Sequence, residues 1–314
     1  MRKIALLFAG QGAQTVGMGE DLAREFTEAA DLFRRADEVL DRKLSDIAWH
    51  GPIEELTRTS NCQPALYVHG LACLSVLRAI VNELPIAAAA GLSLGEWTAH
   101  TAAETFSFED GLRLVERRGT LMQAACEATN GTMAAMIGGD ESAVRQLASE
   151  TGVDVANLNS PGQIVISGER AKVELAVGLA KEHGIRRATI LNVAGAYHSR
   201  LMETAGQKLG KALFEVVLQK PALPVISNVT GAEVETLPEI RRTLQDQVTS
   251  TVRWTDCMER MLAMGCDLFL ELGPGGVLAG LLQRTRKGAE VISMSDCASL
   301  QAGVERIRAV LSDA

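Results

Sequence analysis

The chain has no CxxC pair and no closely spaced set of cysteines, because its six cysteines are scattered over 314 residues. That spacing excludes a small disulfide-bonded scaffold and favours reduced thiols, as in a cytoplasmic-type compartment. No uninterrupted apolar run reaches membrane-spanning length. Two basic residues precede an apolar run at the start, as in a secretion signal, but that run covers only residues 4–9. No convincing processing site follows, so a first β-strand is predicted there.

Charge of one sign is not concentrated in any block, although the formal net charge is −8. An acidic chain without a basic block argues against nucleic acid as the main partner. Nucleotide-binding loops are also missing. Gly10 and Gly12 begin a dinucleotide fingerprint, but Thr15 replaces its next glycine, and no Gly-Lys-Ser/Thr ending follows. A glycine-rich turn remains, which can bring backbone N–H groups to the sheet edge where ligands bind.

Hydrophobic residues make up 47% and charged residues 22% of the chain. This balance is typical of a globular protein, and the length allows about two domains. We find no internal repeat and no low-complexity segment. The predicted strands cover residues 3–9, 86–91, 224–229, 268–272 and 290–293. The predicted helices include residues 63–82, 94–104, 107–125, 199–217, 276–286 and 298–312. Such alternation predicts a mostly parallel sheet covered by helices.

One block has a different order, β-α-β-β-α-β. Its strands are predicted at 132–138, 153–158, 163–168 and 187–193, and its helices at 141–150 and 170–183. That order is typical of a ferredoxin-like unit. The sequence therefore predicts an α/β protein with a discontinuous large domain, residues 1–129 and 196–314, and an inserted small domain, residues 130–195.

Ser93 stands in the pattern Gly-Leu-Ser-Leu-Gly, after a small apolar run and before a helix-forming segment. A serine at a strand-to-helix turn is held in a strained conformation, and the flanking glycines let other backbone pass close by. The N-terminus of the following helix offers N–H groups to a developing oxyanion. Ser93 is therefore predicted to be a nucleophile. The alternative is a serine that only caps a helix.

A serine nucleophile needs a base, and the chain has five histidines. His198 lies where the chain leaves the predicted small domain, at an expected cleft, and is the candidate base. His100 follows Ser93 on the same predicted helix, about 10 Å along its axis, which is too far for a hydrogen bond. The other histidines are expected in the apolar core or at solvated helix ends: His50, His69 and His183.

Arg118 falls inside an apolar stripe of the helix predicted at 107–125. An inward guanidinium is costly unless it meets an anion. Two interpretations stay open: a buried structural salt bridge, or bidentate binding of a ligand carboxylate, to which the planar guanidinium is well suited.

Nine segments, in this order, are similar to one family: GQGAQTVGMG, QPAL, GLSLGEWTA, VERRGTLMQ, NSPGQIVISG, HSRLM, PVISNVTG, VRW and ELGPGGVL. Through them nearly the whole chain resembles the malonyl-CoA:acyl-carrier-protein transacylases of type II fatty acid synthesis, which are homologous to polyketide synthase acyltransferase domains. The resemblance implies an α/β-hydrolase-like large domain with a mostly parallel sheet and an inserted ferredoxin-like α+β domain. It also implies malonyl transfer from malonyl-CoA to the phosphopantetheine thiol of acyl carrier protein, through an acyl-serine.

The resemblance implies catalytic roles position by position. Ser93 would be acylated, and His198 would be the base that deprotonates it. A backbone carbonyl, aligned with that of Gln247, would orient the histidine. The backbone N–H groups of Gln11 and Leu94 would form the oxyanion hole.

Substrate contacts follow from the same resemblance. Arg118 would pair with the free malonyl carboxylate, and Gln63 and Asn159 would also bind substrate. No metal and no permanently bound cofactor is implied. The implied partners are malonyl-CoA and acyl carrier protein, without nucleic acid or membrane, in the cytoplasm or an equivalent organelle stroma or matrix.

Carrier proteins of this pathway are acidic, so docking on this acidic chain is expected to need a local basic patch. Arg186 and Arg187 are the first candidates. The alternative cations lie near residue 285: Arg284, Arg286 and Lys287.

The chain departs from the family pattern at three places. Leu92 replaces the usual histidine before the nucleophile, so no malonyl contact can come from that side chain. The residues before His198 are GAY, which leaves extender choice resting mainly on Arg118. Ala9 replaces a common proline, with no expected effect. Other functions remain open: a discrete polyketide acyltransferase, an α/β-hydrolase esterase or thioesterase, or a non-catalytic binding module.

Overall fold

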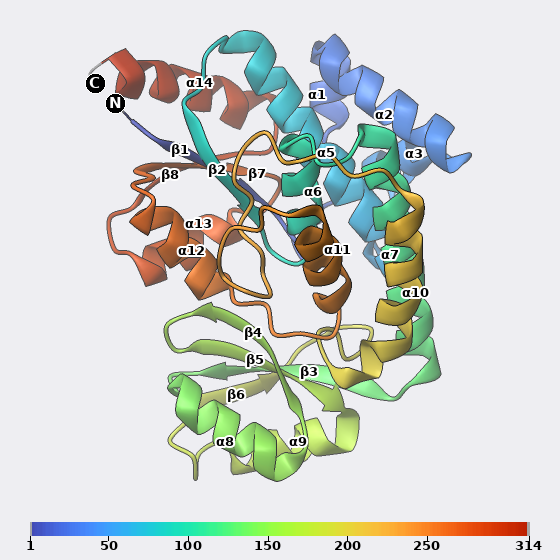
Figure 1. The fold of residues 1–314 in the computed structure, drawn as a ribbon, viewed down its shortest axis with the longest axis vertical. Coiled ribbons are helices and arrows are strands. Elements are labelled where there is room, and N and C mark those ends of the chain that lie inside the picture. The colour runs from blue at the N-terminus through green and yellow to red at the C-terminus, as the bar shows by residue number, and fades with distance from the viewer. Residues whose placement is uncertain (1, 313–314) are drawn as a thin grey trace.

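A parallel four-stranded sheet forms the centre of the larger part of the molecule (Figure 1). The computed structural model describes residues 2–312. The strand order is β2 (Ile86–Gly91), β1 (Ile4–Phe8), β7 (Leu268–Leu272) and β8 (Glu290–Met294). All three pairings are parallel. Parallel strands are covered on both faces, which explains why β1 is apolar throughout and completely buried.

Successive residues of β1 point to opposite cores. Ile4, Leu6 and Phe8 belong to the main core, on the side of the sheet that α5 (Thr59–Ile80) and α6 (Leu94–Ala102) cover. Ala5 and Leu7 belong to a second core, formed with α12 (Trp254–Ala263) and α13 (Val277–Thr285). This alternation is the period of two that a strand imposes.

Further helices complete the larger part of the chain. They are α1 (Glu20–Glu25), α2 (Thr27–Leu40), α3 (Leu44–His50), α4 (Ile53–Thr57), α7 (Phe108–Ala128), the 3-10 turn η1 (Arg200–Met202), α10 (Glu203–Glu215), α11 (Leu237–Asp246) and α14 (Cys297–Ser312).

A second, antiparallel sheet lies at one end of the molecule in Figure 1. Its order is β4 (Asp154–Ser160), β5 (Gln163–Glu169), β3 (Gly131–Ile137) and β6 (Arg187–Ile190). The helices α8 (Glu141–Thr151) and α9 (Arg170–Leu179) share a core with one face of this sheet. Met133 and Val165 on its other face belong to the main core instead. The predicted α/β architecture with an inserted ferredoxin-like unit is confirmed.

The division of the chain into domains remains a proposal. We divide it at residues 130 and 195, because β3 to β6 all lie between these positions and none of them joins the parallel sheet.

One predicted strand is wrong. Residues 224–229 form no continuous β-strand, and only Val225 and Ile226 make isolated β-bridges. The segment exchanges two backbone hydrogen bonds with Ala89, at 2.9 and 3.0 Å, which places it beside β2. Pro224 has no N–H to extend this pairing, and Ile226 then bridges to Glu233 as the chain turns back.

Three predicted elements are shorter than expected. The helix predicted at 170–183 ends at Leu179 and the strand at 187–193 ends at Ile190. The helix predicted at 199–217 begins as the 3-10 turn η1 and ends at Glu215.

Candidate active site

Ser93 occupies the turn between β2 and α6, with φ 55° and ψ −104°. A positive φ is strained for a residue with a side chain, and such strain is often found at functional sites. The two flanking glycines are required by close packing. A Cβ on Gly91 would lie 2.0 Å from the carbonyl carbon of Gly95, and one on Gly95 would lie 2.1 Å from the carbonyl oxygen of Phe8. The turn therefore fits only this glycine-flanked pattern.

The structure brings His198 to Ser93. The Nε2 atom of His198 lies 2.8 Å from Ser93 Oγ, and its Nδ1 lies 2.8 Å from the backbone oxygen of Gln247. Because a carbonyl only accepts, Nδ1 carries the proton and Nε2 can accept one from Ser93. Burial, together with the charge of Arg118, lowers the pKa of His198 to about 4. The imidazole is therefore neutral at pH 7 and able to act as a base.

Arg118 lies directly behind the nucleophile and is completely buried. Its guanidinium donates to Gln63 Oε1 at 2.7 Å, Ser93 Oγ at 3.0 Å and Gln247 Oε1 at 3.1 Å. All three acceptors are neutral oxygens, and Arg118 Nε has no hydrogen-bond partner within residues 2–312. Burial lowers the pKa of Arg118 to about 10, so the side chain remains charged at neutral pH. Of the two interpretations left open by the sequence, a carboxylate-binding guanidinium fits these contacts better than a structural salt bridge.

Gln247 contributes more than the predicted carbonyl. Its side-chain Oε1 accepts from Trp97 Nε1 at 3.0 Å as well as from Arg118, and its Nε2 donates to the backbone oxygen of Ser93 at 2.9 Å. Nε2 also donates to Glu96 Oε2. Gln247 thus holds the histidine through its backbone and the nucleophile turn through its amide.

Asn228 and Glu96 are site residues that the sequence analysis did not single out. Asn228 Oδ1 accepts from the backbone nitrogen of Ser93 at 2.7 Å, and its Nδ2 donates to the oxygen of Gly91 at 2.9 Å. Glu96 Oε2 accepts from the backbone nitrogen of Asn228 at 3.0 Å. A signal for Glu96 was present, since a carboxylate on an apolar helix directly after the nucleophile needs buried partners. Asn228 carried no such local signal.

A cavity of about 470 Å³ opens beside Ser93 and His198. The predicted residues Gln11, Gln63 and Asn159 line it. Asn159 Oδ1 is buried and has no hydrogen-bond partner within residues 2–312. The cavity walls come from the loops that follow β1 and β2, from the small sheet and the segment after it, and from helices that include α5, α7 and α13. Their apolar part comprises Leu92, Met122, Met133, Val165, Leu191, Val193, Ala194, Val277 and Leu281.

The two predicted oxyanion donors belong to the loop after β1 and to the start of α6. Gln11 lines the cavity, and Leu94 is the first residue of α6, whose N–H has no partner one turn earlier in the helix. A Cβ on Gly10 would lie 2.4 Å from the carbonyl oxygen of Leu92, so the loop after β1 passes against the nucleophile turn.

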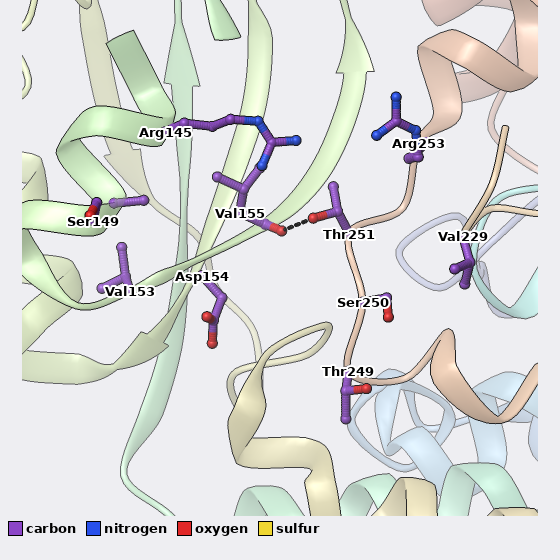
Figure 2. A pocket seen from close by; sticks show the side chains of 11 residues that line it. Arg145, Ser149, Val153, Asp154, Val155, Val229, Thr249, Ser250, Thr251 and Arg253 are labelled. Carbon is purple, nitrogen blue, oxygen red and sulfur yellow. Dashed lines mark hydrogen bonds between the residues drawn. The ribbon is translucent and has the colours of Figure 1, made fainter. Parts of the chain in front are cut away.

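A second hollow, of about 570 Å³, lies where residues 249–253 meet the small sheet (Figure 2). None of the predicted site residues lines it. Thr251 Oγ1 donates to the oxygen of Val155 at 2.6 Å, the contact drawn in Figure 2, and Val252 N donates to the oxygen of Ala156 at 2.8 Å. The segment that follows Gln247 is therefore attached to β4, so the small sheet helps to position the acceptor of His198.

The other histidines are not partners of Ser93. His69 is buried and its Nε2 lies 2.9 Å from the oxygen of Ser295. His100 Nδ1 lies 3.1 Å from Thr105 Oγ1, and burial lowers the pKa of His100 to about 3. His50 is exposed at the end of α3, beside Asp46.

The carboxylates that a hydrolase triad would need lie elsewhere. Asp154 pairs with Arg200, and Glu169 pairs with Lys172 on the surface. His198 contacts a backbone oxygen instead of either carboxylate. This arrangement disfavours the esterase triad, which requires an acidic partner for the histidine.

Thiols and metal ligands offer no competing site in the described chain. Burial raises the pKa of Cys62 to about 12 and that of Cys126 to about 11, so these thiols remain protonated and unreactive. Residues 2–312 contain no group of three or more His, Cys, Asp or Glu side chains arranged to hold a metal ion. None of the helices described is both long enough and apolar enough to cross a membrane.

Comparison with known proteins identifies close relatives. A malonyl CoA-acyl carrier protein transacylase of Bacillus subtilis is 40% identical over 313 residues, which cover 98% of each chain. A polyketide-biosynthesis malonyl CoA-acyl carrier protein transacylase of the same organism is 40% identical over 294 residues, 92% of this chain and 99% of the relative.

Solved structures of malonyltransferases have a fold similar to that of this chain. An acyl-carrier-protein-S-malonyltransferase of Bartonella henselae has a TM-score of 0.93 at 38% identity, covering 98% of this chain and 99% of that chain. A malonyl-transacylase in complex with its type II polyketide synthase acyl-carrier protein has a TM-score of 0.93 at 36% identity, with 97% and 99% covered. Residues 5–307 match the family model described as an acyl transferase domain. The chain therefore belongs to the acyl transferase domain family.

Proposed function

We propose that this acyltransferase moves a malonyl group from malonyl-CoA to the phosphopantetheine thiol of an acyl carrier protein, through an ester on Ser93. The observation that carries the proposal is the hydrogen-bonded set Ser93, His198 and Gln247, together with a buried Arg118 that contacts Ser93 and has only neutral oxygens as direct partners. The names of the relatives support the same substrate and acceptor.

The acylation step follows from the contacts of Ser93. His198 Nε2 takes the Oγ proton as Oγ attacks the thioester carbonyl, and the N–H groups of Gln11 and Leu94 stabilise the resulting oxyanion. When the C–S bond breaks, the proton on His198 passes to the leaving thiolate. The second half-reaction runs in reverse with the thiol of the carrier protein as nucleophile.

The weak basicity of His198 favours a thiol over water as the acceptor. A free thiol has a pKa of about 8.5 and water one of about 15.7, so the thiol loses its proton far more readily. His198 is held by a neutral carbonyl and has a pKa lowered to about 4, which makes it a modest base. Such a base suits transfer to a thiol better than hydrolysis.

Arg118 supplies a recognition element for malonyl. Its Nη2 already touches Ser93 Oγ, so an acyl group on that oxygen carries its carboxylate next to the guanidinium. The unpartnered Nε adds a further donor. Charge-assisted hydrogen bonds of this kind are about twice as strong as neutral ones.

Two pathways fit the proposal equally well. A relative named malonyl CoA-acyl carrier protein transacylase and one whose name adds polyketide biosynthesis are both 40% identical to this chain. We propose a cytoplasmic enzyme with no resident cofactor, acting either on fatty acid or on polyketide carrier proteins.

Incubation with malonyl-CoA followed by intact-mass measurement tests the proposal. Wild-type protein gains one malonyl group and loses it when carrier protein is added, whereas Ser93→Ala gains none. His198→Ala loads more slowly by about 10² to 10⁴. Release of malonate without carrier protein would indicate a hydrolase. Persistent labelling of Ser93→Ala, or no labelling of wild type, would rule out the acyl-Ser93 mechanism.

A further inference from the structure

Glu96 is a completely buried acid that the transfer steps above do not use. It lies in the first turn of α6, next to the nucleophile. Its Oε2 accepts from Asn228 N and Gln247 Nε2, while its Oε1 has no hydrogen-bond partner within residues 2–312. A buried carboxylate with one unsatisfied oxygen is costly, so its retention at this point needs an explanation.

One amide group connects Glu96 to Arg118. Gln247 Oε1 accepts from Arg118 Nη2, and Gln247 Nε2 donates to Glu96 Oε2. The negative form of Glu96 raises the pKa of Arg118 against the effect of burial, and Arg118 in turn lowers the pKa of Glu96. Because the direct partners of Arg118 are neutral, ionised Glu96 acts as its counter-charge in the empty site.

Glu96 is the group at this position that changes charge near neutral pH. Burial, opposed by these hydrogen bonds and by Arg118, leaves the pKa of Glu96 raised to about 7. The charged or titratable groups facing it are Arg118 of α7 and Cys257 of α12, and His198 lies beyond Arg118. Its neutral neighbours are Ser227, Asn228 and Gln247. Arg118 stays charged, while His198 and Cys257 stay neutral, through the neutral range.

We propose that Glu96 neutralises Arg118 in the empty site and takes up a proton from solvent when a malonyl carboxylate occupies Arg118. Two carboxylates beside one buried cation cannot both remain ionised cheaply, so the arrival of the second favours protonation of the first. This inference rests on the proposed pairing of Arg118 with malonyl. It makes Glu96 a positioning residue whose proton tunes the preference for malonyl over acetyl.

The consequence is a preference that depends on pH. Below about pH 7 Glu96 is already protonated, and malonyl binds without proton uptake. Above about pH 7 the binding of malonyl must take up a proton. The malonyl-to-acetyl ratio of kcat/KM therefore falls by up to about tenfold per pH unit in that range. Titration of His198 or of the acceptor thiol affects both acyl groups and cancels in the ratio.

The test measures that ratio from about pH 6 to pH 9 with malonyl- and acetyl-N-acetylcysteamine thioesters. Wild type shows the fall, Glu96→Gln gives a flat ratio, and Glu305→Gln, an exposed acid on α14, behaves like wild type. A flat wild-type ratio, or an unchanged slope in Glu96→Gln, would overturn the inference.

A second measurement does not depend on folding of the Glu96 variant. Calorimetric binding of the two thioesters to Ser93→Ala at about pH 8, in buffers of different ionisation enthalpy, counts protons. Uptake approaching one proton for malonyl and none for acetyl supports the inference, and equal uptake overturns it. If Arg118→Ala leaves the malonyl preference intact, the proposed role of Arg118 fails. If that preference depends on Arg118 but no proton is taken up, only the role of Glu96 fails.

Discussion

At the scale of single residues, we propose Arg118 as the group that distinguishes malonyl from acetyl, since the two acyl groups differ by one carboxylate. Its guanidinium is completely buried and touches Ser93 Oγ, with only neutral oxygens as partners. Leu92, which lines the cavity directly before the nucleophile, is apolar and offers no second cation to a carboxylate.

Replacement of Arg118 by alanine should therefore lower malonyl transfer and spare acetyl transfer. Charge-assisted contacts contribute about 1.5–3 kcal/mol each, so loss of a bidentate pair corresponds to about 10² to 10⁴ in kcat/KM for malonyl. Arg118→Lys should recover little, because an ammonium cannot reproduce the planar fork. The measurement is kcat/KM for both thioesters in wild type and both variants. Equal losses for the two substrates would mean that Arg118 is structural.

At the scale of elements, the start of α6 depends on close contact with β1. Gly95 lies in the first turn of α6, where an added Cβ would meet the oxygen of Phe8 at 2.1 Å. Gly178, on α9, is also helical but has no atom within 4 Å of the same added Cβ. The two glycines therefore form a matched pair: Gly95 is packed against β1, and Gly178 has open space around it.

Gly95→Ala should force α6 away from β1 and move the N–H of Leu94 with it. Overpacking of this kind costs about 1–3 kcal/mol, and we expect a matching loss of stability together with slower Ser93 loading. Gly178→Ala should keep wild-type loading and gain about 0.4–1 kcal/mol, because it only restricts the unfolded chain. Urea unfolding and malonyl loading check both variants. Wild-type stability and loading in Gly95→Ala would contradict the packing argument.

The elements also show what the sequence could predict. The four parallel strands and the β-α-β-β-α-β order could be predicted from the sequence. Strands buried on both faces appear as short apolar runs, and the change between strand and helix periodicity marks each element. The segment 224–229 has the same apolar character, yet it makes only isolated bridges, to Ala89 and to Glu233, since strand pairing depends on which backbone lies beside the segment.

The site shows the same limit. The structure brings together Ser93, His198 and the Gln247 carbonyl, which the motifs had singled out, whereas the side chains of Glu96 and Asn228 were missed. Their mutual contact and the contact of Asn228 with Ser93 join positions more than 130 residues apart in the chain. No local pattern encodes such a contact.

At the scale of the whole molecule, the cavity lies between the small sheet and the loops that follow β1 and β2, and a carrier protein must dock over its mouth to reach Ser93. Val277 of α13 is 48% exposed and lines the cavity, and Arg284 on the same helix donates to Gln163 of β5, another lining residue. Arg186 packs over Gly138, which bonds to the Gly162 turn beside Gln163. Arg186 and Arg284 are therefore near the mouth.

The remaining basic candidates lie elsewhere. Arg286 and Lys287 line a separate hollow with Asp267 at the start of β7, the opposite end of the strands from Ser93. Because the sheet is parallel and its active edge is at the strand C-termini, these two cations are far from the entrance.

Arg186 and Arg187 lie on the side of the cavity mouth, whereas Arg286 and Lys287 lie far from it. The second pair therefore serves as an internal control in a test of docking. The double variant Arg186→Glu, Arg187→Glu removes two exposed positive charges on the small-sheet side of the mouth. Since rim charges act mainly on encounter, it should raise the KM for carrier protein several-fold, more strongly at low salt, and leave loading from malonyl-CoA unchanged. Arg286→Glu, Lys287→Glu makes the same change in net charge at the distant hollow and should leave both steps unchanged. If both double variants raise the KM for carrier protein equally, net charge rather than a local patch governs docking. If neither variant raises this KM, the carrier protein uses another face.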